Sequence, residues 1–201
     1  MDSELTADLD AMRRGDQAAF SRVFRAVQPG LLRYLGALVG AEAEEVAAET
    51  WAHVCRDLAK FSGGIDDFRG WVARIGRNRA IDHVRMTGRR PQAAADADVL
   101  IERAAPGSDP QDRVAESMST AAALAAIRSL PPDQAEAVLL RAVIGLDAGA
   151  AAKVLGKRPG AVRTAAYRGL RTLAARLDEQ AGDGAALRSD VLALLDADET
   201  R

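Results

Sequence analysis

The chain has 201 residues, of which 48% are hydrophobic and only 4% aromatic, and its formal net charge is −2. This length suits one medium-sized domain or two small ones, and abundant alanine favours helices because alanine has the highest helix propensity. A single cysteine excludes an internal disulfide and fits a reducing compartment. There is no uncharged apolar stretch of about 18 residues and no signal-peptide pattern at the acidic N-terminus. We therefore expect an all-α, cytoplasmic protein without membrane insertion.

The sequence shows no arrangement of side chains that would support catalysis. There is no Gly-rich phosphate loop, and two histidines and one cysteine cannot form a zinc site unaided. Neither His53 nor His83 belongs to a serine–histidine–acid arrangement, and Cys55 is interpreted as a small packing residue. We predict no enzymatic activity, no catalytic residue, no cofactor and no metal.

Apolar spacing predicts three helices in the first ninety residues. The first spans 4–39, carries an apolar stripe from Phe20 to Val27, is interrupted at Pro29-Gly30 and stops at Gly40. The second spans 42–60 and begins with glutamates, which favour a helix N-terminus. Its mixed charged and aromatic surface suits either a protein interface or a solvated face. A Ser-Gly-Gly turn precedes the third helix, at 68–88.

Composition changes sharply after residue 90. The stretch 91–116 contains three prolines and six acidic residues, which predicts a flexible acidic linker. Helices are expected again at 119–129 and 132–144. We divide the chain into a helical domain at 1–90, a linker at 91–118, a second helical domain at 119–178 and a tail at 179–201 with a short amphipathic helix.

The region 145–177 has the pattern of a helix-turn-helix. A short helix with small residues at 147–155 is followed by Gly156, which suits a tight turn, and Pro159 suits the first turn of a second helix. We expect Val162, Ala166 and Leu170 to face inward. The span 153–177 has seven basic residues and no acid, as expected for a helix that reads base edges while flanking cations bind phosphates. An ordinary helical pair with a solvated basic face is the alternative.

The helix at 68–88 mixes arginines with aromatic and amide side chains. Arginines bind phosphates, aromatic rings stack on unpaired bases and amides read base edges, so this combination suits single-stranded nucleic acid. Burial in the core is an equally good interpretation for Trp71 and Ile75. The polar residues Asn78, Arg79, Asp82 and His83 argue for an exposed surface.

Three strings together resemble extracytoplasmic-function (ECF) sigma factors, which are bacterial transcription initiation factors. Residues 68–85, FRGWVARIGRNRAIDHVR, resemble the helix of that family that reads the −10 promoter element. The string EVAAETW at 45–51 is similar to its polymerase-binding helix. LPPDQ at 130–134, VLLR at 138–141 and VLGKRPGAVR at 154–163 resemble its −35-reading domain. The resemblance covers about residues 15–178, in the order that the family shows.

The resemblance implies a role for each surface. Helix 42–60 would bind the clamp coiled coil of core RNA polymerase, and 68–88 would capture the melted −10 strand with a base flipped from the stack. Helix 159–177 would enter the major groove at −35. The residues implied for polymerase binding are Glu45, Val46, Glu49, Thr50, Trp51, Val54 and Leu58. Those implied for the −10 strand are Phe68, Trp71, Arg74, Asn78, Arg79, Asp82, His83 and Arg85. Those implied for −35 duplex DNA are Lys157, Arg158, Arg163, Thr164, Tyr167, Arg168 and Arg171.

Two other functions compete with this reading. A conventional helix-turn-helix regulator, binding duplex DNA without polymerase, would explain 145–177 but leaves the arginine-rich helix without a role. An enzyme acting through residues 1–90 is disfavoured because no acid–base or metal constellation is present. The family also implies an anti-sigma factor as a further partner.

Overall fold

The computed structural model describes residues 2–88 and 121–179, and every regular element in these two ranges is helical. The predicted linker and most of the predicted tail lie outside the described residues. The first range contains α1 (Asp2–Arg13), α2 (Gln17–Val39), α3 (Ala43–Asp57) and α4 (Ile65–Thr87). The second contains a helical segment at 121–128, α6 (Pro132–Val138), α7 (Ala148–Leu155) and α8 (Pro159–Glu179).

The first helix predicted from sequence is in fact two helices. The chain turns after Arg13, and Asp16 caps α2 by accepting hydrogen bonds from the Ala18 and Ala19 N–H groups at 2.8 and 3.0 Å. Pro29, in contrast, lies inside α2 and does not end it. Proline weakens a helix locally, but Val27 and Leu31 on either side of it are buried. Their tertiary packing explains why the helix continues to the predicted stop at Gly40.

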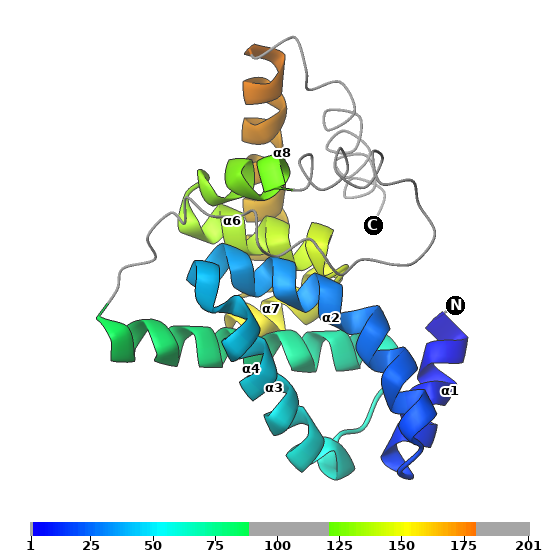
Figure 1. Ribbon diagram of the computed structural model, residues 1–201. Coiled ribbons are helices and arrows are strands. Elements are labelled where there is room, and N and C mark those ends of the chain that lie inside the picture. Colours follow the sequence, from blue (N-terminus) through cyan, green and yellow to red (C-terminus); the bar gives the residue numbers. More distant parts are fainter. Residues whose placement is uncertain (1, 89–120, 180–201) are drawn as a thin grey trace, which may run out of the picture.

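Helix α4 crosses the middle of the N-terminal group of helices and packs on α2 and α3 (Figure 1). Gly76 makes this close approach possible, because a Cβ built there would lie 3.1 Å from Leu31 Cδ1 and 3.5 Å from Thr50 Oγ1. A continuous series of ring contacts surrounds the crossing and ties α2, α3 and α4 together. Its members are Phe20, Phe24, Trp51, Phe61, Phe68 and Trp71.

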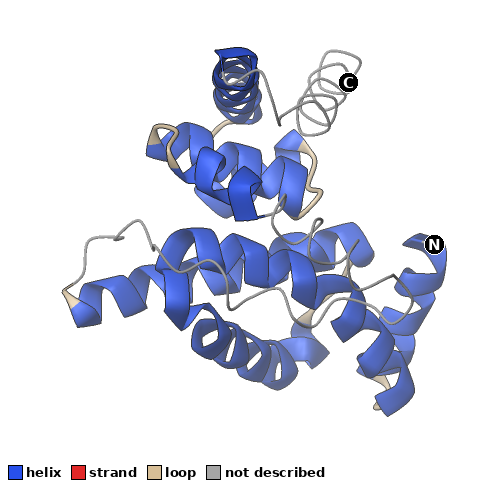
Figure 2. Cartoon of the chain, turned by 45° about the horizontal axis from the view of Figure 1, so that its top comes forward, coloured by secondary structure: helices blue, strands red, loops and turns tan. Residues whose placement is uncertain are grey.

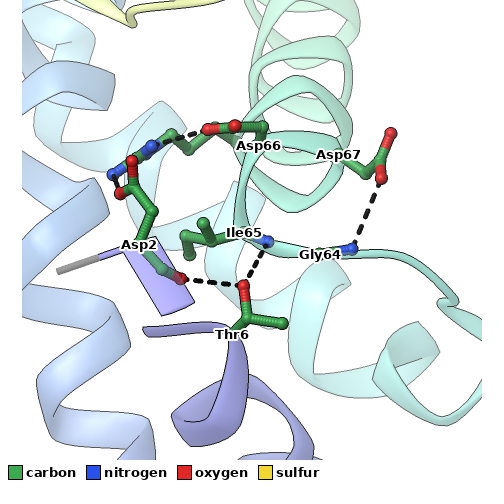
Figure 3. A network of polar contacts seen from close by, with 7 residues as sticks. Asp2, Thr6, Gly64, Ile65, Asp66 and Asp67 are labelled. Atoms are coloured by element: carbon green, nitrogen blue, oxygen red, sulfur yellow. Dashed lines mark hydrogen bonds and ion pairs between the residues drawn. The ribbon is translucent and has the colours of Figure 1, made fainter. Parts of the chain in front are cut away.

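The beginning of α4 is held by α1 (Figure 3). Thr6 Oγ1 accepts a hydrogen bond from the Ile65 N–H at 3.3 Å and donates to the Asp2 carbonyl at 2.8 Å. The Arg69 guanidinium forms ion pairs with Asp2 and Asp66. The Thr6 hydroxyl satisfies a backbone donor that the first turn of a helix leaves without an intrahelical partner, and the ion pairs hold the same turn against α1.

The C-terminal helices form a second layer against the first, as Figure 2 shows. Helix α6 packs on α8, and a π-helical turn, η3 (Leu139–Val143), extends α6. Helix α7 contacts α4, where a Cβ at Gly70 would meet Leu146 Cδ2 at 3.8 Å and the Ala150 methyl at 3.9 Å. A cavity of about 330 Å³ lies between α2 and η3. The two layers of helices are therefore not in close contact along their whole length.

Candidate nucleic-acid interface

A pocket lies between α3 and α4. Its volume is about 320 Å³. The side chains that line it are His53 from α3 and Trp71, Arg74, Ile75, Asn78, Arg79 and Asp82 from α4. Ile75 is buried, whereas Arg74, Asn78 and Asp82 are exposed and Trp71 and Arg79 are half-buried. An aromatic ring, an amide and two guanidinium groups therefore share one concave surface.

Five of the eight residues assigned from sequence to the −10 strand line this pocket. They are Trp71, Arg74, Asn78, Arg79 and Asp82. Arg85 is exposed further along α4, where it lies 3.8 Å from Asp82, and His83 is half-buried outside the pocket. Phe68 must be corrected: its side chain is fully buried between Trp51, Phe61 and Trp71, so it has no surface to offer DNA.

Two other arginines of α4 are engaged by ion pairs and do not line the pocket. Arg69 binds Asp2 and Asp66, as described above. Arg77 donates from Nε and an NH2 group to the two carboxylate oxygens of Glu136 in α6, at 2.9 and 3.0 Å. This bidentate hydrogen bonding raises the pKa of Arg77 further above its ordinary value. The buried Tyr34 hydroxyl lies near the same pair, and burial raises the pKa of Tyr34 strongly.

The face of α3 that was assigned to polymerase binding is largely a core face. Glu45 and Glu49 are exposed, but Val46, Thr50, Trp51 and Val54 are buried and Leu58 is half-buried. Most of the residues that the resemblance implied for this role lie on the side of α3 that packs on α2 and α4, and apolar residues mark the core more reliably than a docking surface. The polar groups on this side have hydrogen-bond partners within the protein. Thr50 donates to the Val46 carbonyl at 2.7 Å, and Trp51 Nε1 donates to Gln28 Oε1 at 2.6 Å.

The exposed arc of α3 is a different set of residues. It comprises Glu44, Glu45, Ala48, Glu49, Ala52, Cys55 and Arg56. The interpretation of Cys55 as a packing residue was also wrong, because Cys55 is exposed. His53 and Asp57 border this arc, and neither was assigned from sequence to the surface that faces α4. Their spacing of four on a helix, which places two side chains next to each other, was the available signal.

The helix-turn-helix is confirmed in its details. Asp147 caps α7 by accepting from the Ala150 N–H at 2.7 Å. Gly156 then ends α7 in the left-handed conformation, and Pro159 opens α8. Val162, Ala166 and Leu170 are buried as predicted, and Ala151 and Ala152 are buried in α7. Gly169 is needed for the packing of α8 on α6, because a Cβ there would approach Val138 Cγ2 to 2.8 Å.

All seven residues assigned to −35 duplex DNA lie on the exposed surface of this motif. They are Lys157, Arg158, Arg163, Thr164, Tyr167, Arg168 and Arg171. Lys157 forms an ion pair with Asp133 at 2.7 Å, and the Arg171 guanidinium lies 5.9 Å from the centre of the Tyr167 ring. Within the described part of the chain, Arg158, Arg163 and Arg168 have no acidic partner. Their charge is therefore available to a polyanion.

The described residues contain no group of three or more histidine, cysteine, aspartate or glutamate side chains that could hold a metal ion. None of the helices in 2–88 and 121–179 combines the length and the apolar composition that crossing a membrane requires.

Comparison with known proteins assigns both groups of helices to one family. The family model of sigma-70 region 2 matches residues 23–90, and that of sigma-70 region 4 matches residues 120–173. The chain is 34% identical to the ECF RNA polymerase sigma factor BldN of Streptomyces coelicolor, over 86% of this chain and 66% of BldN. It is 31% identical to the ECF RNA polymerase sigma factor ShbA of Streptomyces griseus, over 82% of this chain and 91% of ShbA.

A solved structure shares the fold. It is that of CnrH in complex with the cytosolic domain of CnrY, with a TM-score of 0.56 and 23% identity. The similarity covers 89% of this chain and 97% of CnrH.

Proposed function

Since the chain belongs to the extracytoplasmic-function group of RNA polymerase sigma factors, we propose that it directs core RNA polymerase to specific promoters and helps to open their −10 element. Core polymerase carries out the phosphoryl transfer, and this chain contributes promoter specificity without an enzymatic step of its own. Its place of action is then the cytoplasm, where the polymerase and the promoter DNA are found.

The observation that carries the proposal is the pocket between α3 and α4. It gathers an aromatic ring at Trp71, an amide at Asn78 and a guanidinium at Arg79. Unpaired bases bind to such surfaces by stacking and by hydrogen bonds to their exposed edges. A base in a duplex has its ring faces stacked and its Watson–Crick edge paired, so the pocket binds the opened strand in preference to the duplex. Binding that discriminates in this way shifts the equilibrium between closed and open DNA toward the open state.

Duplex recognition is assigned to α8. Its exposed cations extend over more than two turns, with Arg163 near the start of the helix and Arg168 and Arg171 beyond it. The N-terminal part of a recognition helix reaches base edges, while flanking cations bind phosphates. The net charge of −2 makes the whole chain a weak DNA ligand by itself, because affinity for DNA comes mainly from neutralised phosphates. Attachment to polymerase compensates by raising the effective concentration of both surfaces at the promoter.

The exposed arc of α3 is assigned to core polymerase. It combines the glutamates of the first turns with Ala48, Ala52 and Arg56 in one continuous stripe. Small side chains between charged ones allow a partner helix to approach closely while the charges set its register. The partner would be the clamp coiled coil that the family resemblance implies. A protein that masks this arc or the DNA-reading surfaces would act as an anti-sigma factor.

The test is reconstitution with core polymerase that lacks any sigma factor. The purified chain is run with the core on size exclusion, and the complex then transcribes a pool of promoter fragments. We expect co-elution and transcripts from a defined set of promoters. Glu45→Arg, on the exposed arc of α3, should abolish co-elution. Asp10→Arg, an equally exposed charge reversal on α1, is the matched control and should leave co-elution unchanged. Duplex binding by the chain alone, without co-elution, would contradict the proposal.

A further inference from the structure

Three side chains connect α3 to the pocket in one hydrogen-bonded series. His53 Nε2 lies 3.1 Å from Asp57 Oδ2, one turn further along α3. On the opposite side of the ring, His53 Nδ1 lies 3.1 Å from an NH2 group of Arg79 in α4. Both His53 and Arg79 line the pocket. The series thus runs from the edge of α3 to a guanidinium of the proposed −10 surface.

The chemistry of arginine indicates which tautomer of the neutral histidine ring fits this geometry. A guanidinium has only donors, so His53 Nδ1 accepts the hydrogen bond from Arg79 and carries no proton. The proton of the neutral ring is then on Nε2, which donates it to the Asp57 carboxylate. A ring protonated on both nitrogens would instead direct an N–H at the guanidinium and place two cations against each other.

Asp57 is held as a carboxylate by further partners. Lys60 Nζ lies 2.5 Å from Asp57 Oδ1, and Arg56 Nε lies 4.0 Å from Oδ2. The hydrogen bond from Lys60 is the main reason that the pKa of Asp57 is below its ordinary value, and the positive charges of Lys60 and Arg56 add to the effect. The charged acceptor in turn orients the ring, as second-sphere carboxylates do for histidines in other binding sites.

We propose that His53 is a positioning residue, which holds the Arg79 guanidinium at the pocket so that its remaining donors face an unpaired base or its phosphate. This inference rests on the proposed function of the pocket and deepens it. Arginine has many rotamers, and restricting one before the ligand arrives removes an entropic cost from binding. The residue that does this belongs to α3 and makes no assigned contact with DNA itself.

Amide substitutions separate the two hydrogen bonds of the ring. In His53→Asn the side-chain oxygen can occupy the place of Nδ1 and accept from Arg79. In His53→Gln the amide reaches the place of Nε2 and contacts Asp57 only, and His53→Leu keeps neither bond. Each variant is bound to core polymerase and titrated with a single-stranded −10 oligonucleotide. We expect His53→Leu and His53→Gln to weaken strand binding about tenfold, since hydrogen bonds to charged groups carry effects of this size, and His53→Asn to stay close to the unchanged chain.

Two controls make the result specific to positioning. Thermal unfolding of each variant identifies any loss that comes from instability, which a positioning role does not require. In an Arg79→Ala background, His53→Leu should have no further effect, because the residue it positions is gone. An effect of His53→Leu that persists without Arg79, or His53→Asn as weak as His53→Leu, would overturn the inference.

A measurement on the free chain separates this inference from the proposed function. The ring tautomer of His53 is read from ¹⁵N chemical shifts, with the proton expected on Nε2 and none on Nδ1. A proton on Nδ1 would overturn the positioning role whatever the pocket binds. The correct tautomer in a chain that fails to bind polymerase or the −10 strand would contradict the proposed function but leave the connection of His53 with Arg79 intact.

Discussion

The two candidate DNA-reading helices differ in how much of their charge the protein itself already engages. On α4, Arg69, Arg77 and Arg79 bind partners from α1, α6 and α3 respectively. On α8, Arg163 and Arg168 have no such partner in the described residues. The polar side chains of a central helix form hydrogen bonds and ion pairs with the helices around it. Those of a peripheral helix have fewer such neighbours and stay accessible to a ligand. Counting cations along a sequence therefore overestimates the free charge of a central helix.

The largest effect on stability should come from a substitution in the buried face of α4, compared with one at its pocket face. Phe68→Ala removes a fully buried ring and should destabilise the protein by about 3–5 kcal/mol. The Trp71 side chain is half-buried at the pocket. Trp71→Ala should therefore lower stability less than Phe68→Ala does but weaken binding of the −10 strand more. Denaturant unfolding and oligonucleotide binding by the two variants are compared. Equal losses of stability would show that α4 has no distinct reading surface at Trp71.

The next effect concerns α8. Arg163→Ala should weaken discrimination of the −35 element by about 1–3 kcal/mol, the value of a good base contact, because the side chain is exposed near the start of the helix. Polymerase binding should be unchanged. Transcription from promoters with and without the −35 sequence measures this, with Arg13→Ala on α1 as the exposed-arginine control. Loss of co-elution with polymerase would contradict the assignment.

Asn78→Ala should have a smaller effect, on opening only. The Asn78 amide is exposed at the pocket. A base that is still paired has no free Watson–Crick edge with which to bond it. One lost hydrogen bond is worth about 0.5–1.5 kcal/mol, so permanganate reactivity of melted thymines should fall several-fold while closed-complex affinity is kept. An unchanged thymine signal would remove Asn78 from the reading surface.

The smallest effect should come from the contact between the two groups of helices. Glu136→Gln removes the charge that binds Arg77 across that contact. A partly exposed ion pair of this kind is worth no more than about 1 kcal/mol and is screened by salt. We expect a modest increase in the radius of gyration measured by X-ray scattering at low salt, and a smaller difference from the unchanged chain at high salt. Identical scattering at both salt concentrations would show that Arg77 does not hold the two groups together.

Much of the fold could be predicted from local signals, and the errors have a common origin. Gly40, Gly156 and Pro159 mark element ends because their backbone preferences act whatever surrounds them. Pro29 and Phe68 were misread because their surroundings decide: buried neighbours keep α2 helical through the proline, and three other rings enclose the phenylalanine.

The candidate site likewise has one part that local signals predict and one part that depends on tertiary packing. The exposed residues of α8 follow from one helical period, since a peripheral helix has one buried face. The pocket needs α3 and α4 side by side, and the crossing that joins them depends on Gly76, which lies 19 residues after Asp57, the last residue of α3. His53 could not be paired with Arg79 without that crossing. The proposed polymerase face, for the same reason, moved from the apolar side of α3 to its exposed arc.

The contact between Arg77 and Glu136 has a consequence on the scale of a promoter. Elements centred about 25 base pairs apart are separated by roughly 85 Å along B-form DNA. Here the two groups of helices touch, with the paired atoms of Arg77 and Glu136 only 2.9 Å apart. Under the proposed function, reading both elements at once would require the two groups to part. The stretch 89–120 that joins them could span about 100 Å when extended, so the covalent chain itself is long enough for the distance.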